Sequence, residues 1–286
     1  MGSSGLFLLT LKAIMSSPYA VFGNPISQSK SPLIHATFAD ELGIDAPYEA
    51  ILAPEGGFNA ALHAFIVGGG RGCNITAPFK IDAFNGATQV MTRAKTAGAA
   101  NVLSLQAGQI IADNVDGVGL VADITQNLGL ALLGARILVI GAGGAARGVL
   151  LPLLEARPAQ ITLANRTLIR AQAVAACMAS YGAVQPQSFE TLQGGYDVII
   201  NATSGALHGA GLDIGPQVFE KTGLAYDMTY GKGLTPFLQL AKQGGARHLA
   251  DGVGMLVEQA AESCLIWHGK RPSTAALIAR LTVPFH

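Results

Sequence analysis

The chain has 286 residues, of which half are hydrophobic and 13% are charged, and this length is about that of two typical domains. A charged fraction near half the usual ~25% excludes a chain made mostly of solvated, disordered segments. The 18 basic and 18 acidic side chains cancel, so no net field attracts a polyanion, and we expect a small-molecule ligand rather than nucleic acid.

Residues 1–16 are predicted to form an N-terminal extension outside the fold. The apolar run Leu6–Leu9 looks like part of a signal peptide, but it lacks a basic flank before it and a small-residue cleavage site after it. The mean hydropathy of the chain is +0.40, yet no run reaches the ~18 consecutive apolar residues that span a bilayer. No membrane partner is therefore expected.

From Tyr19 onward, short strand-like runs alternate with stretches of helical period, which predicts an α/β fold with parallel sheets and helices on their faces. In the first region the predicted strands are Tyr19–Phe22, Cys73–Ile75 and Ile110–Asp113, and the predicted helices are Pro32–Leu42, Gly56–Val67 and Pro78–Gln89.

The second region is more regular and predicts a doubly wound, Rossmann-type series. Its predicted strands are Arg136–Ile140, Gln160–Ala164, Tyr196–Asn201 and Leu224–Met228, with alanine-rich helical stretches between them. After Gly252 a helical period returns, and a last helix follows from Pro272. No repeat or low-complexity linker marks a domain boundary, so the boundaries rest on pattern alone.

A glycine-rich turn joins the strand Arg136–Ile140 to the apolar helical stretch that follows it. The turn reads Gly141-Ala142-Gly143-Gly144-Ala145-Ala146, and the order strand, turn, helix is that of a dinucleotide site. The first glycine allows the tight turn, the second lets main-chain N–H groups approach a pyrophosphate, and Ala146 is small enough for close helix packing. The helix N-terminus supplies the anion site.

The end of the next strand indicates which dinucleotide binds. An NAD site normally places Asp or Glu there to bind the ribose 2′-hydroxyl, whereas this chain has Asn165-Arg166-Thr167, followed by Arg170. A guanidinium pairs with a 2′-phosphate, Arg170 adds a second charge and Thr167 can donate a hydroxyl hydrogen bond. The predicted cofactor is NADP. If these arginines formed only a solvated helix start, the missing acid would be unexplained.

Two serines precede the first predicted helix, in Ser29-Lys30-Ser31-Pro32. Two hydroxyls at period two on an extended segment, ahead of a helix N-terminus, are able to hold a substrate carboxylate. Ser31 taken alone is better explained as the N-cap of that helix. The segment by itself is therefore ambiguous.

A lysine stands at a helix start in Asn74-Ile75-Thr76-Ala77-Pro78-Phe79-Lys80. Pro78 is predicted to begin the helix, which puts Lys80 in its first turn, where the positive end of the helix dipole opposes a cation. A lysine in this position is suited to proton transfer, and its natural partner is a carboxylate. Of the two acids in the later Asp113–Gly117 segment, Asp113 is interpreted, with Asn114, as a turn former.

Cysteine and histidine usage predicts no metal site. Cys73, Cys177 and Cys264 are far apart and form no C-x-x-C pair, and the six histidines show no H-E-x-x-H arrangement. Unpaired, buried thiols are typical of a reducing cytoplasm, which is the predicted location.

In order along the chain, these motifs resemble the shikimate dehydrogenase family, and the likeness extends from about Tyr19 to the C-terminus. The segments that carry it are Ala20–Ile26, Ser29–Pro32, Asn74–Lys80, Asp116–Gly119, Gly141–Gly144, Asn165–Thr167, Asn201–Ser204 and Asp251–Met255. The chain looks like the NADP-preferring biosynthetic type.

The resemblance implies two α/β domains. A substrate-binding and catalytic domain, residues 17–115 and 252–286, would surround an inserted NADP-binding domain, residues 116–251. The implied reaction is the reversible NADPH-dependent reduction of 3-dehydroshikimate to shikimate, in the pathway to chorismate and the aromatic amino acids. Shikimate or 3-dehydroshikimate is the implied small-molecule partner. A homodimer is one option for an oligomeric state that stays open.

The resemblance also implies roles for single residues. Lys80 and Asp116 match the catalytic pair of the family. The positions that match its substrate-binding residues are Ser29, Ser31, Thr76, Lys80, Asn101, Asp116, Tyr230 and Gln259. The positions that match residues lining the cofactor are Gly141, Ala142, Gly143, Gly144, Ala145, Asn165, Arg166, Thr167, Arg170, Met228 and Gly252.

The sequence departs from the family pattern at three places. Val102 and Val115 stand where the family often has threonine, and each removes one hydroxyl. Met91-Thr92-Arg93 occupies the stretch where a glutamate frequently follows Leu-Thr. These changes leave the reacting groups intact and bear on the choice of substrate.

Two alternative functions are open at this point. The first is an NAD-linked quinate or shikimate dehydrogenase. Such an enzyme is expected to have Asp or Glu at the strand end, but this chain has Asn165–Thr167 there and no acidic residue. A non-catalytic NADP-binding sensor of the same fold would have lost turnover. The retention of Lys80, Asp116, Tyr230 and Gln259 together speaks against a sensor.

Overall fold

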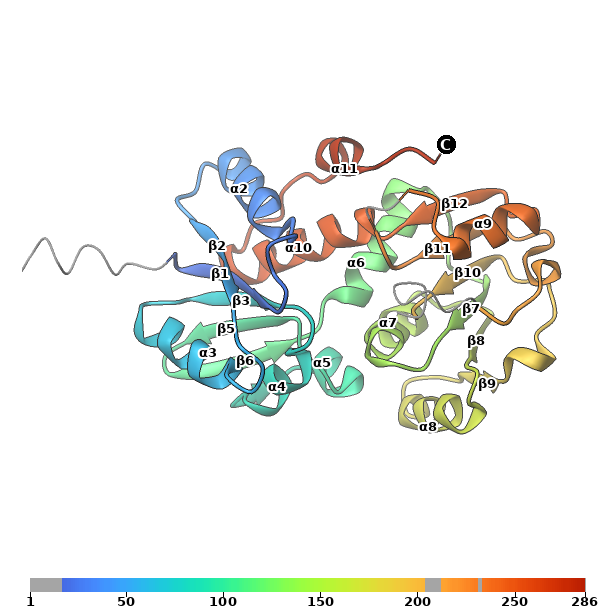
Figure 1. The fold of residues 1–286 in the computed structure, drawn as a ribbon, viewed down its shortest axis with the longest axis horizontal. Helices are drawn as coiled ribbons and strands as arrows, with labels where there is room; N and C mark the ends of the chain where they lie inside the picture. The colour runs from blue at the N-terminus through green and yellow to red at the C-terminus, as the bar shows by residue number, and fades with distance from the viewer. Residues whose placement is uncertain (1–16, 204–211, 231–232, 286) are drawn as a thin grey trace, which may run out of the picture. The chain divides into compact units, whose positions relative to one another are not determined.

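The structure is a computed structural model, and it describes residues 17–203, 212–230 and 233–285 (Figure 1). The predicted extension, residues 1–16, lies outside the described residues. Contacts divide the chain into two compact units: unit 1 comprises Met1–Lys95, Ala99–Asn114 and Ser263–Pro272, and unit 2 comprises Thr96–Gly98, Val115–Glu262 and Ser273–His286. The predicted α/β fold class is confirmed, whereas the predicted domain boundaries, which rest on ligand-binding roles, stay predictions.

Unit 1 contains a mixed sheet with the strand order β2-β1-β3-β5-β6-β4. Its strands are β1 (Tyr19–Gly23), β2 (Tyr48–Leu52), β3 (Gly72–Ile75), β4 (Gln89–Val90), β5 (Val102–Gln106) and β6 (Gln109–Asp113). β1 is parallel to β2 and β3, but β5 is antiparallel to both β3 and β6. In the turn between β5 and β6, Ala107 and Gly108 have φ values of 49° and 76°, and positive φ at both positions suits a two-residue hairpin. The prediction of a wholly parallel first sheet is therefore wrong, because this turn reverses the direction of the chain.

The helices α2 (Ser31–Leu42), α3 (Phe58–Val67) and α4 (Lys80–Asn85) belong to unit 1, while α5 (Thr92–Ala97) and α10 (Val253–His268) have residues in both units. Phenylalanine rings form much of the core of unit 1: the ring of Phe58 lies 5.9 Å from that of Phe22 and 5.2 Å from that of Phe79. The helix predicted over Pro78–Gln89 is shorter than expected, since it begins at Lys80 and the residues from Gln89 pair with β6 instead.

Unit 2 contains a parallel sheet with the strand order β12-β11-β10-β7-β8-β9. Its strands are β7 (Arg136–Ile140), β8 (Gln160–Ala164), β9 (Gln185–Gln187), β10 (Val198–Asn201), β11 (Leu224–Asp227) and β12 (His248–Asp251). Numbered within the unit, this order is 3-2-1-4-5-6 read from β9, that of a doubly wound dinucleotide-binding fold. β7 pairs with β8 on one side and with β10 on the other, and the strand order runs outward from this pair in opposite directions. The switch point therefore lies between β7 and β10. The predicted Rossmann-type series is confirmed.

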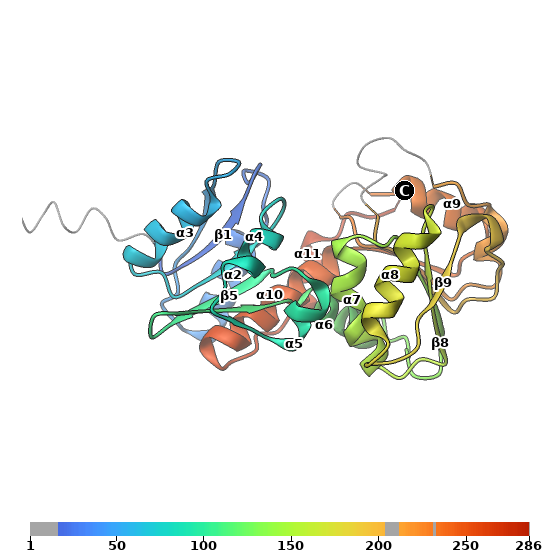
Figure 2. The same cartoon turned by 90° about the horizontal axis from the view of Figure 1, so that it is seen from below.

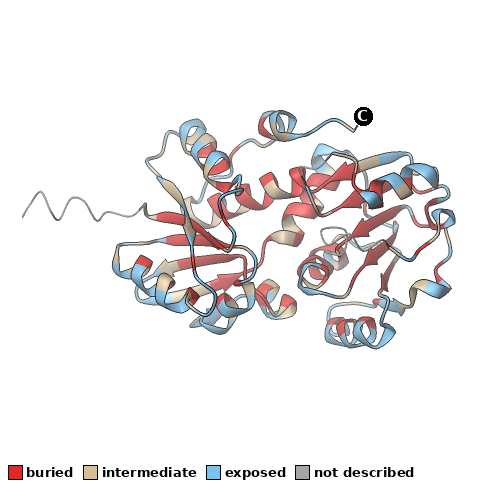
Figure 3. Cartoon of the chain, in the orientation of Figure 1, coloured by how far each residue is buried: buried red, intermediate tan, exposed pale blue. Residues whose placement is uncertain are grey.

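The remaining elements of unit 2 connect or cover these strands. They are α6 (Asp116–Ala122), the π-helical turn η2 (Asp123–Asn127), α7 (Gly144–Glu155), α8 (Leu168–Met178), the short turns η3 (Phe189–Thr191) and η5 (Pro216–Phe219), α9 (Pro236–Gln243) and α11 (Ala275–Leu281). α8 runs beside β8 and β9 (Figure 2). The central strands β7, β10 and β11 are buried almost throughout (Figure 3), as expected for parallel strands covered on both faces.

The three cysteines are unpaired thiols, but they differ in exposure. Cys73 and Cys264 are buried, as expected, whereas Cys177 is exposed on α8. The prediction of a buried thiol is therefore wrong for Cys177. Within the described ranges, no helix is both long and apolar enough to cross a membrane.

Candidate functional site

In unit 1, the polar residues that the sequence singles out gather where β3 ends. The Ile75 N–H donates to the Asn101 carbonyl over 2.9 Å, and the Ala100 N–H donates to the Lys80 carbonyl over 2.8 Å. Thr76 follows β3 directly, and Lys80 is the first residue of α4. These main-chain hydrogen bonds bring Thr76, Lys80 and Asn101 to one edge of the sheet.

The position of Thr76 depends on a glycine at the end of β1. A Cβ at Gly23 would lie 2.5 Å from Thr76 Cγ2 and 2.8 Å from Ile26 Cδ1, so a larger residue would displace both side chains. The Thr76 N–H also donates to the Phe22 carbonyl over 2.9 Å. The first motif of the sequence, Ala20–Ile26, therefore has a local structural purpose, which is to seat Thr76.

Asn74 forms the centre of a buried polar network. Its Oδ1 accepts a hydrogen bond from Tyr48 Oη at 2.8 Å and faces His35 Nε2 at 3.2 Å, while its Nδ2 donates to the Asn101 carbonyl at 3.3 Å and to Ser263 Oγ at 2.9 Å. Both donors and both acceptor positions of the amide are thus used. Sequence reasoning included Asn74 in a motif but did not assign it a role, and it missed Tyr48 and His35 altogether.

Ser29 and Ser31, at the start of α2, are arranged differently from the prediction. Ser31 is the first residue of α2, and the N-cap position belongs to Lys30, which makes no side-chain capping bond. The Ser29 hydroxyl instead accepts the Ser31 N–H over 3.2 Å. Burial raises the pKa of the Tyr48 hydroxyl, and a hydrogen bond with the Ser31 side chain opposes that rise. The interpretation of Ser31 as an N-cap is wrong, and its hydroxyl instead extends the Asn74 network.

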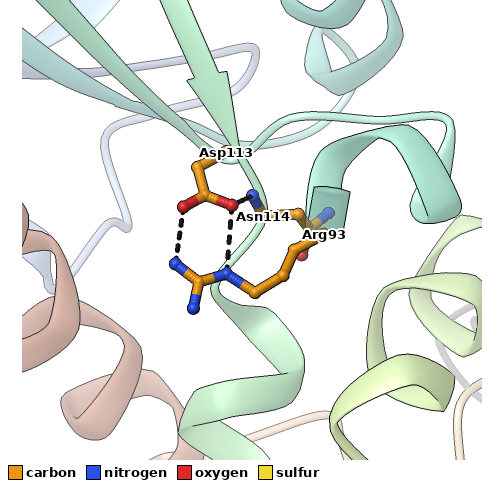
Figure 4. Close-up of polar contacts among 3 residues, drawn as sticks. All are labelled: Arg93, Asp113 and Asn114. Carbon is orange, nitrogen blue, oxygen red and sulfur yellow. Dashed lines mark hydrogen bonds and ion pairs between the residues drawn. The ribbon is translucent and has the colours of Figure 1, made fainter. Parts of the chain in front are cut away.

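Asp113 is more than a turn former. Arg93 binds it with two nitrogens, Nε at 3.1 Å from Oδ1 and Nη2 at 2.5 Å from Oδ2, and the Asn114 N–H donates to the same carboxylate over 2.7 Å (Figure 4). The Asp113 carbonyl also accepts the Asn101 N–H over 3.0 Å. This bidentate pair therefore supports the strand end next to Asn101. The sequence offered a signal for it, since Arg93 stands in the stretch that departs from the family pattern.

We expect His35 to make the stability of the protein sensitive to acid. Burial lowers its pKa to about 3, although the hydrogen bond with Asn74 favours the charged form. An unfolded histidine, with its pKa near 6.5, binds its proton first as the pH falls, so the free energy of unfolding decreases between these values by up to about 1.4 kcal/mol per pH unit. Urea unfolding of the wild type and of His35→Gln from about pH 7 to pH 4.5 measures this slope.

The variant keeps a hydrogen-bonding side chain at position 35 but removes the titration. Its unfolding free energy should therefore fall less steeply with decreasing pH than that of the wild type. All other titrating groups are common to the two proteins and cancel in the comparison. If the unfolding free energies of the two proteins fall equally steeply with decreasing pH, His35 binds its proton as readily in the folded protein as in the unfolded one, and the expectation is wrong.

In unit 2, a glycine allows the sharp turn at the end of β7. Gly141 has a φ of +110°, which side chains other than that of glycine rarely adopt. A Cβ there would also lie 2.9 Å from Thr203 Cγ2 and 3.2 Å from the Ala202 carbonyl oxygen. Gly141 thus lies directly at the switch point between β7 and β10, where doubly wound folds bind their ligands.

The start of α7 is open enough for a bound phosphate. Gly143 is the N-cap residue of α7 and Gly144 its first residue, and a Cβ added at either would meet no other part of the described chain within 4 Å. Gly143, Gly144 and Ala145 are all exposed. The first N–H groups of a helix have no partner within the helix, and together with the positive end of this twelve-residue helix they favour an anion here.

The residues after β8 form the predicted 2′-phosphate region. Asn165 Nδ2 donates to the Thr167 carbonyl over 2.9 Å, which braces the turn into α8. Arg166 and Arg170 are exposed, and they lie at the positive end of α8, where cations are disfavoured unless an anion binds. Thr167 is the N-cap residue, but its side chain makes no capping bond. The loop therefore has the donors that a phosphate group needs.

Met228 and Gly252 lie against each other at the ends of β11 and β12. A Cβ at Gly252 would collide with the Met228 carbonyl oxygen, so only glycine permits this approach. Behind Met228, the buried Asn201 and Asp227 brace the strand ends: Asn201 Nδ2 donates to Asp227 Oδ1 over 3.1 Å, and Thr235 Oγ1 donates to Asp227 Oδ2 over 2.6 Å. These hydrogen bonds join the ends of β10 and β11 to the start of α9.

Asp116 is the first residue of α6, which packs between α7 and α10 through two glycines. A Cβ at Gly117 would lie 2.6 Å from the Gly148 carbonyl oxygen in α7, and one at Gly119 would lie 2.8 Å from the Gln259 main-chain nitrogen in α10. Such contacts allow backbone to approach backbone. In unit 2, the glycines of the Asp-Gly-Val-Gly motif therefore fix how closely α6, which begins with Asp116, packs against the part of α10 that carries Gln259.

The predicted site residues are divided between the units. Ser29, Ser31, Thr76, Lys80 and Asn101 belong to unit 1, whereas Asp116, Tyr230, Gln259 and the predicted cofactor residues belong to unit 2. Gln259 is buried and its Nε2 donates to the Leu256 carbonyl over 2.9 Å. Tyr230 is 40% exposed. The roles of these residues, including the pairing of Lys80 with Asp116, remain predictions.

Comparison with known families gives matches in three parts of the chain. Residues 21–103 match the shikimate dehydrogenase substrate binding domain, residues 123–208 match shikimate / quinate 5-dehydrogenase, and residues 252–282 match the shikimate 5′-dehydrogenase C-terminal domain. These segments follow the same order as the motifs found in the sequence.

Relatives of known type extend the match over nearly the whole chain. Proteins named shikimate dehydrogenase (NADP(+)) from Dechloromonas aromatica and Nitrosospira multiformis are each 52% identical over 268 residues, which is 93% of this chain and 98% of theirs. The crystal structure of an Ael1 enzyme from Pseudomonas putida is 46% identical, with a TM-score of 0.91, over 95% of this chain and 100% of that one. Shikimate 5-dehydrogenase from Thermus thermophilus, in complex with NADP(H) and shikimate, is 30% identical, with a TM-score of 0.80, over 91% of this chain and 97% of that one. This chain therefore belongs to the shikimate dehydrogenase family.

Proposed function

We propose that this protein catalyses the reversible, NADPH-dependent reduction of 3-dehydroshikimate to shikimate, a step in the formation of chorismate and the aromatic amino acids. The observation that carries the proposal is the polar edge of unit 1, where main-chain hydrogen bonds hold Thr76, Lys80 and Asn101 together. The half-identical relatives named shikimate dehydrogenase (NADP(+)) support the same substrate and cofactor.

The residues of unit 2 fit NADP. Gly141 allows the tight turn, Gly143 and Gly144 leave room for a pyrophosphate at the start of α7, and the exposed Arg166 and Arg170 supply positive charge where NAD-binding proteins have an acid. Ala142, Ala145, Asn165, Thr167, Met228 and Gly252 complete the proposed lining. When bound, the reduced nicotinamide supplies the hydride.

The remaining roles belong to side chains of the protein. Ser29 and Ser31 would anchor the substrate carboxylate, and Thr76, Asn101, Tyr230 and Gln259 would bind its hydroxyl and ketone oxygens, which orients the ketone for reduction. Lys80 would stabilise the developing alkoxide or protonate it, and Asp116 would hold Lys80 and a substrate hydroxyl in place. In the reverse direction, the shikimate hydroxyl that is oxidised would give up its proton to Lys80.

The domain roles, partner and location are part of the proposal. Residues 17–115 and 252–286 would bind the substrate, and residues 116–251 would bind NADP. The proposed partner is the small-molecule substrate, the proposed compartment is the cytoplasm, and a homodimer is the assembly to test by light scattering.

The experiment compares four pairs of substrates with the purified protein. Shikimate or quinate is mixed with NADP+ or NAD+, and the absorbance of the reduced nicotinamide is followed. We expect turnover to be fastest with shikimate and NADP+. Faster turnover with NAD+, or with quinate, would favour the NAD-linked quinate/shikimate dehydrogenase, and no turnover with any pair would favour the non-catalytic sensor.

A further inference from the structure

A buried carboxylate that has no proposed role lies at the centre of unit 2. Asp123 is 3% exposed and begins the π-helical turn η2 that continues α6. Tyr226 Oη donates to its Oδ2 over 2.7 Å, and Asn127 Nδ2 donates to its Oδ1 over 3.0 Å. A π-helical turn inside a helix is rare and is often found at functional sites.

The Asp123 carboxylate also abuts the first turn of α10. A Cβ at Gly254 would collide with Asp123 Oδ1, so the carboxylate occupies the space that a side chain at position 254 would fill. The Tyr226 hydroxyl, which donates to Asp123, accepts the Met255 N–H over 3.2 Å. A negative charge is favoured at this end of a sixteen-residue helix. Asp123 thus joins three elements: α6, β11 and α10.

A second arm of the network extends along α10. Asn127 Nδ2 donates to Glu258 Oε1 over 2.9 Å, and Thr274 Oγ1 donates to the same oxygen over 2.6 Å. Both carboxylates are buried, and the carboxylate of Asp251, at the end of β12, also acts on Asp123 electrostatically. Buried acids are costly unless they are hydrogen-bonded, so this arrangement serves a purpose beyond filling the core.

Each element that Asp123 joins carries a residue of the proposed site. α6 begins with Asp116, β11 leads into Met228, and α10 follows Gly252 and carries Gln259. We propose that Asp123 is a positioning residue: acting through Tyr226, it sets the start of α10, and with it Gly252 and Gln259, against Met228 and Asp116. This inference rests on the proposed function, since it assigns Asp123 to the same reaction.

Removal of one hydroxyl tests the inference. In Tyr226→Phe the ring remains in the core, but the bridge between Asp123 and the Met255 N–H is lost. We expect kcat/KM for shikimate to fall about tenfold, with a higher KM for shikimate, as for the loss of a buried hydrogen bond. The dissociation constant of NADPH, measured by fluorescence, should change less than kcat/KM does, because Met228 and Gly252 supply only part of the proposed cofactor lining and the phosphate-binding residues at the start of α7 and the end of β8 lie on other elements.

Turnover is expressed per NADPH-binding site, so that loss of folded protein alone does not lower it. The matched control is Tyr196→Phe, which removes a hydroxyl from another buried tyrosine of unit 2, where it donates a long hydrogen bond of 3.5 Å to Gln187 Oε1. Its kcat/KM per site should stay within about twofold of the wild type. Asp123→Asn is the second variant: its amide places a donor opposite a donor of Tyr226 or Asn127, and its loss should be at least as large.

The possible outcomes separate the two proposals. If the wild type turns over shikimate but Tyr226→Phe and Asp123→Asn match it per site, the positioning role is overturned and the proposed function stands. A loss of the same size in Tyr196→Phe would also overturn it, because the effect would then follow from damage to the core. A wild type inactive with shikimate would overturn the proposed function, and this inference with it.

Discussion

Replacement of Lys80 by alanine is expected to lower kcat for shikimate oxidation by about 10²–10⁴, the usual contribution of a general acid or base. The KM for shikimate should change much less, because Ser29, Ser31, Thr76 and Asn101 still bind the ring and its carboxylate. An interaction made mainly in the transition state affects kcat in this way, whereas uniform binding affects KM. Steady-state kinetics with saturating NADP+ measure both constants.

Lys95 provides the matched control for Lys80. It is exposed on α5 in the same unit, and Lys95→Ala removes the same charge at a position with no proposed role. Its kinetic constants should stay within about twofold of the wild type. Near-normal turnover in Lys80→Ala would contradict the catalytic role, and a rise in KM with unchanged kcat would make Lys80 a binding residue only.

The fold of unit 2 was the part most open to prediction from the sequence. Buried parallel strands read as continuous apolar runs, and the predicted strands Arg136–Ile140 and Gln160–Ala164 coincide with β7 and β8 in both bounds. The turn at Gly141 could be predicted because its backbone conformation is one that glycine alone adopts readily. In unit 2, the apolar strand runs and the glycine turn both predict a doubly wound fold.

Strands at the periphery of the sheets were missed, for a physical reason. β2 (Tyr48–Leu52) is only partly buried along its length, and β4 consists of two residues. Neither has the apolar run or the clean alternation by which a strand is identified. Their pairing with β1 and β6 depends on tertiary context, which no local pattern contains.

The candidate site shows the same division between local and distant information. Lys80, Thr76 and the glycine turn could be identified because their signals are local: a helix start, a strand end and a tight turn. The pairing of Arg93 with Asp113 joins residues 20 positions apart, and Asn74 bonds to Ser263, 189 positions away. Spacing along the chain does not reveal such partners, so Asp113 was predicted only as a turn former.

The double replacement of Arg166 and Arg170 by alanine is expected to raise the KM for NADP+ by about 100-fold or more, since each charge-assisted hydrogen bond to a phosphate is worth about 1.5–3 kcal/mol. The KM for NAD+, which lacks the 2′-phosphate, should change by less than about threefold. The two arginines are far along the cofactor from the hydride, so kcat at saturating NADP+ should be nearly unchanged. Steady-state kinetics with both cofactors give the ratio directly.

Arg247→Ala is the control for this loss of charge, because Arg247 is an exposed arginine next to β12, at the opposite edge of the same sheet. Its KM for NADP+ should match that of the wild type. Two cations at the positive end of α8 oppose the helix dipole, so the double variant should also be at least as stable as the wild type without nucleotide, as measured by thermal unfolding. An equal rise in KM for NADP+ and NAD+ would mean that the arginines bind a part common to both cofactors, and the basis for NADP selection would then have to lie elsewhere in unit 2.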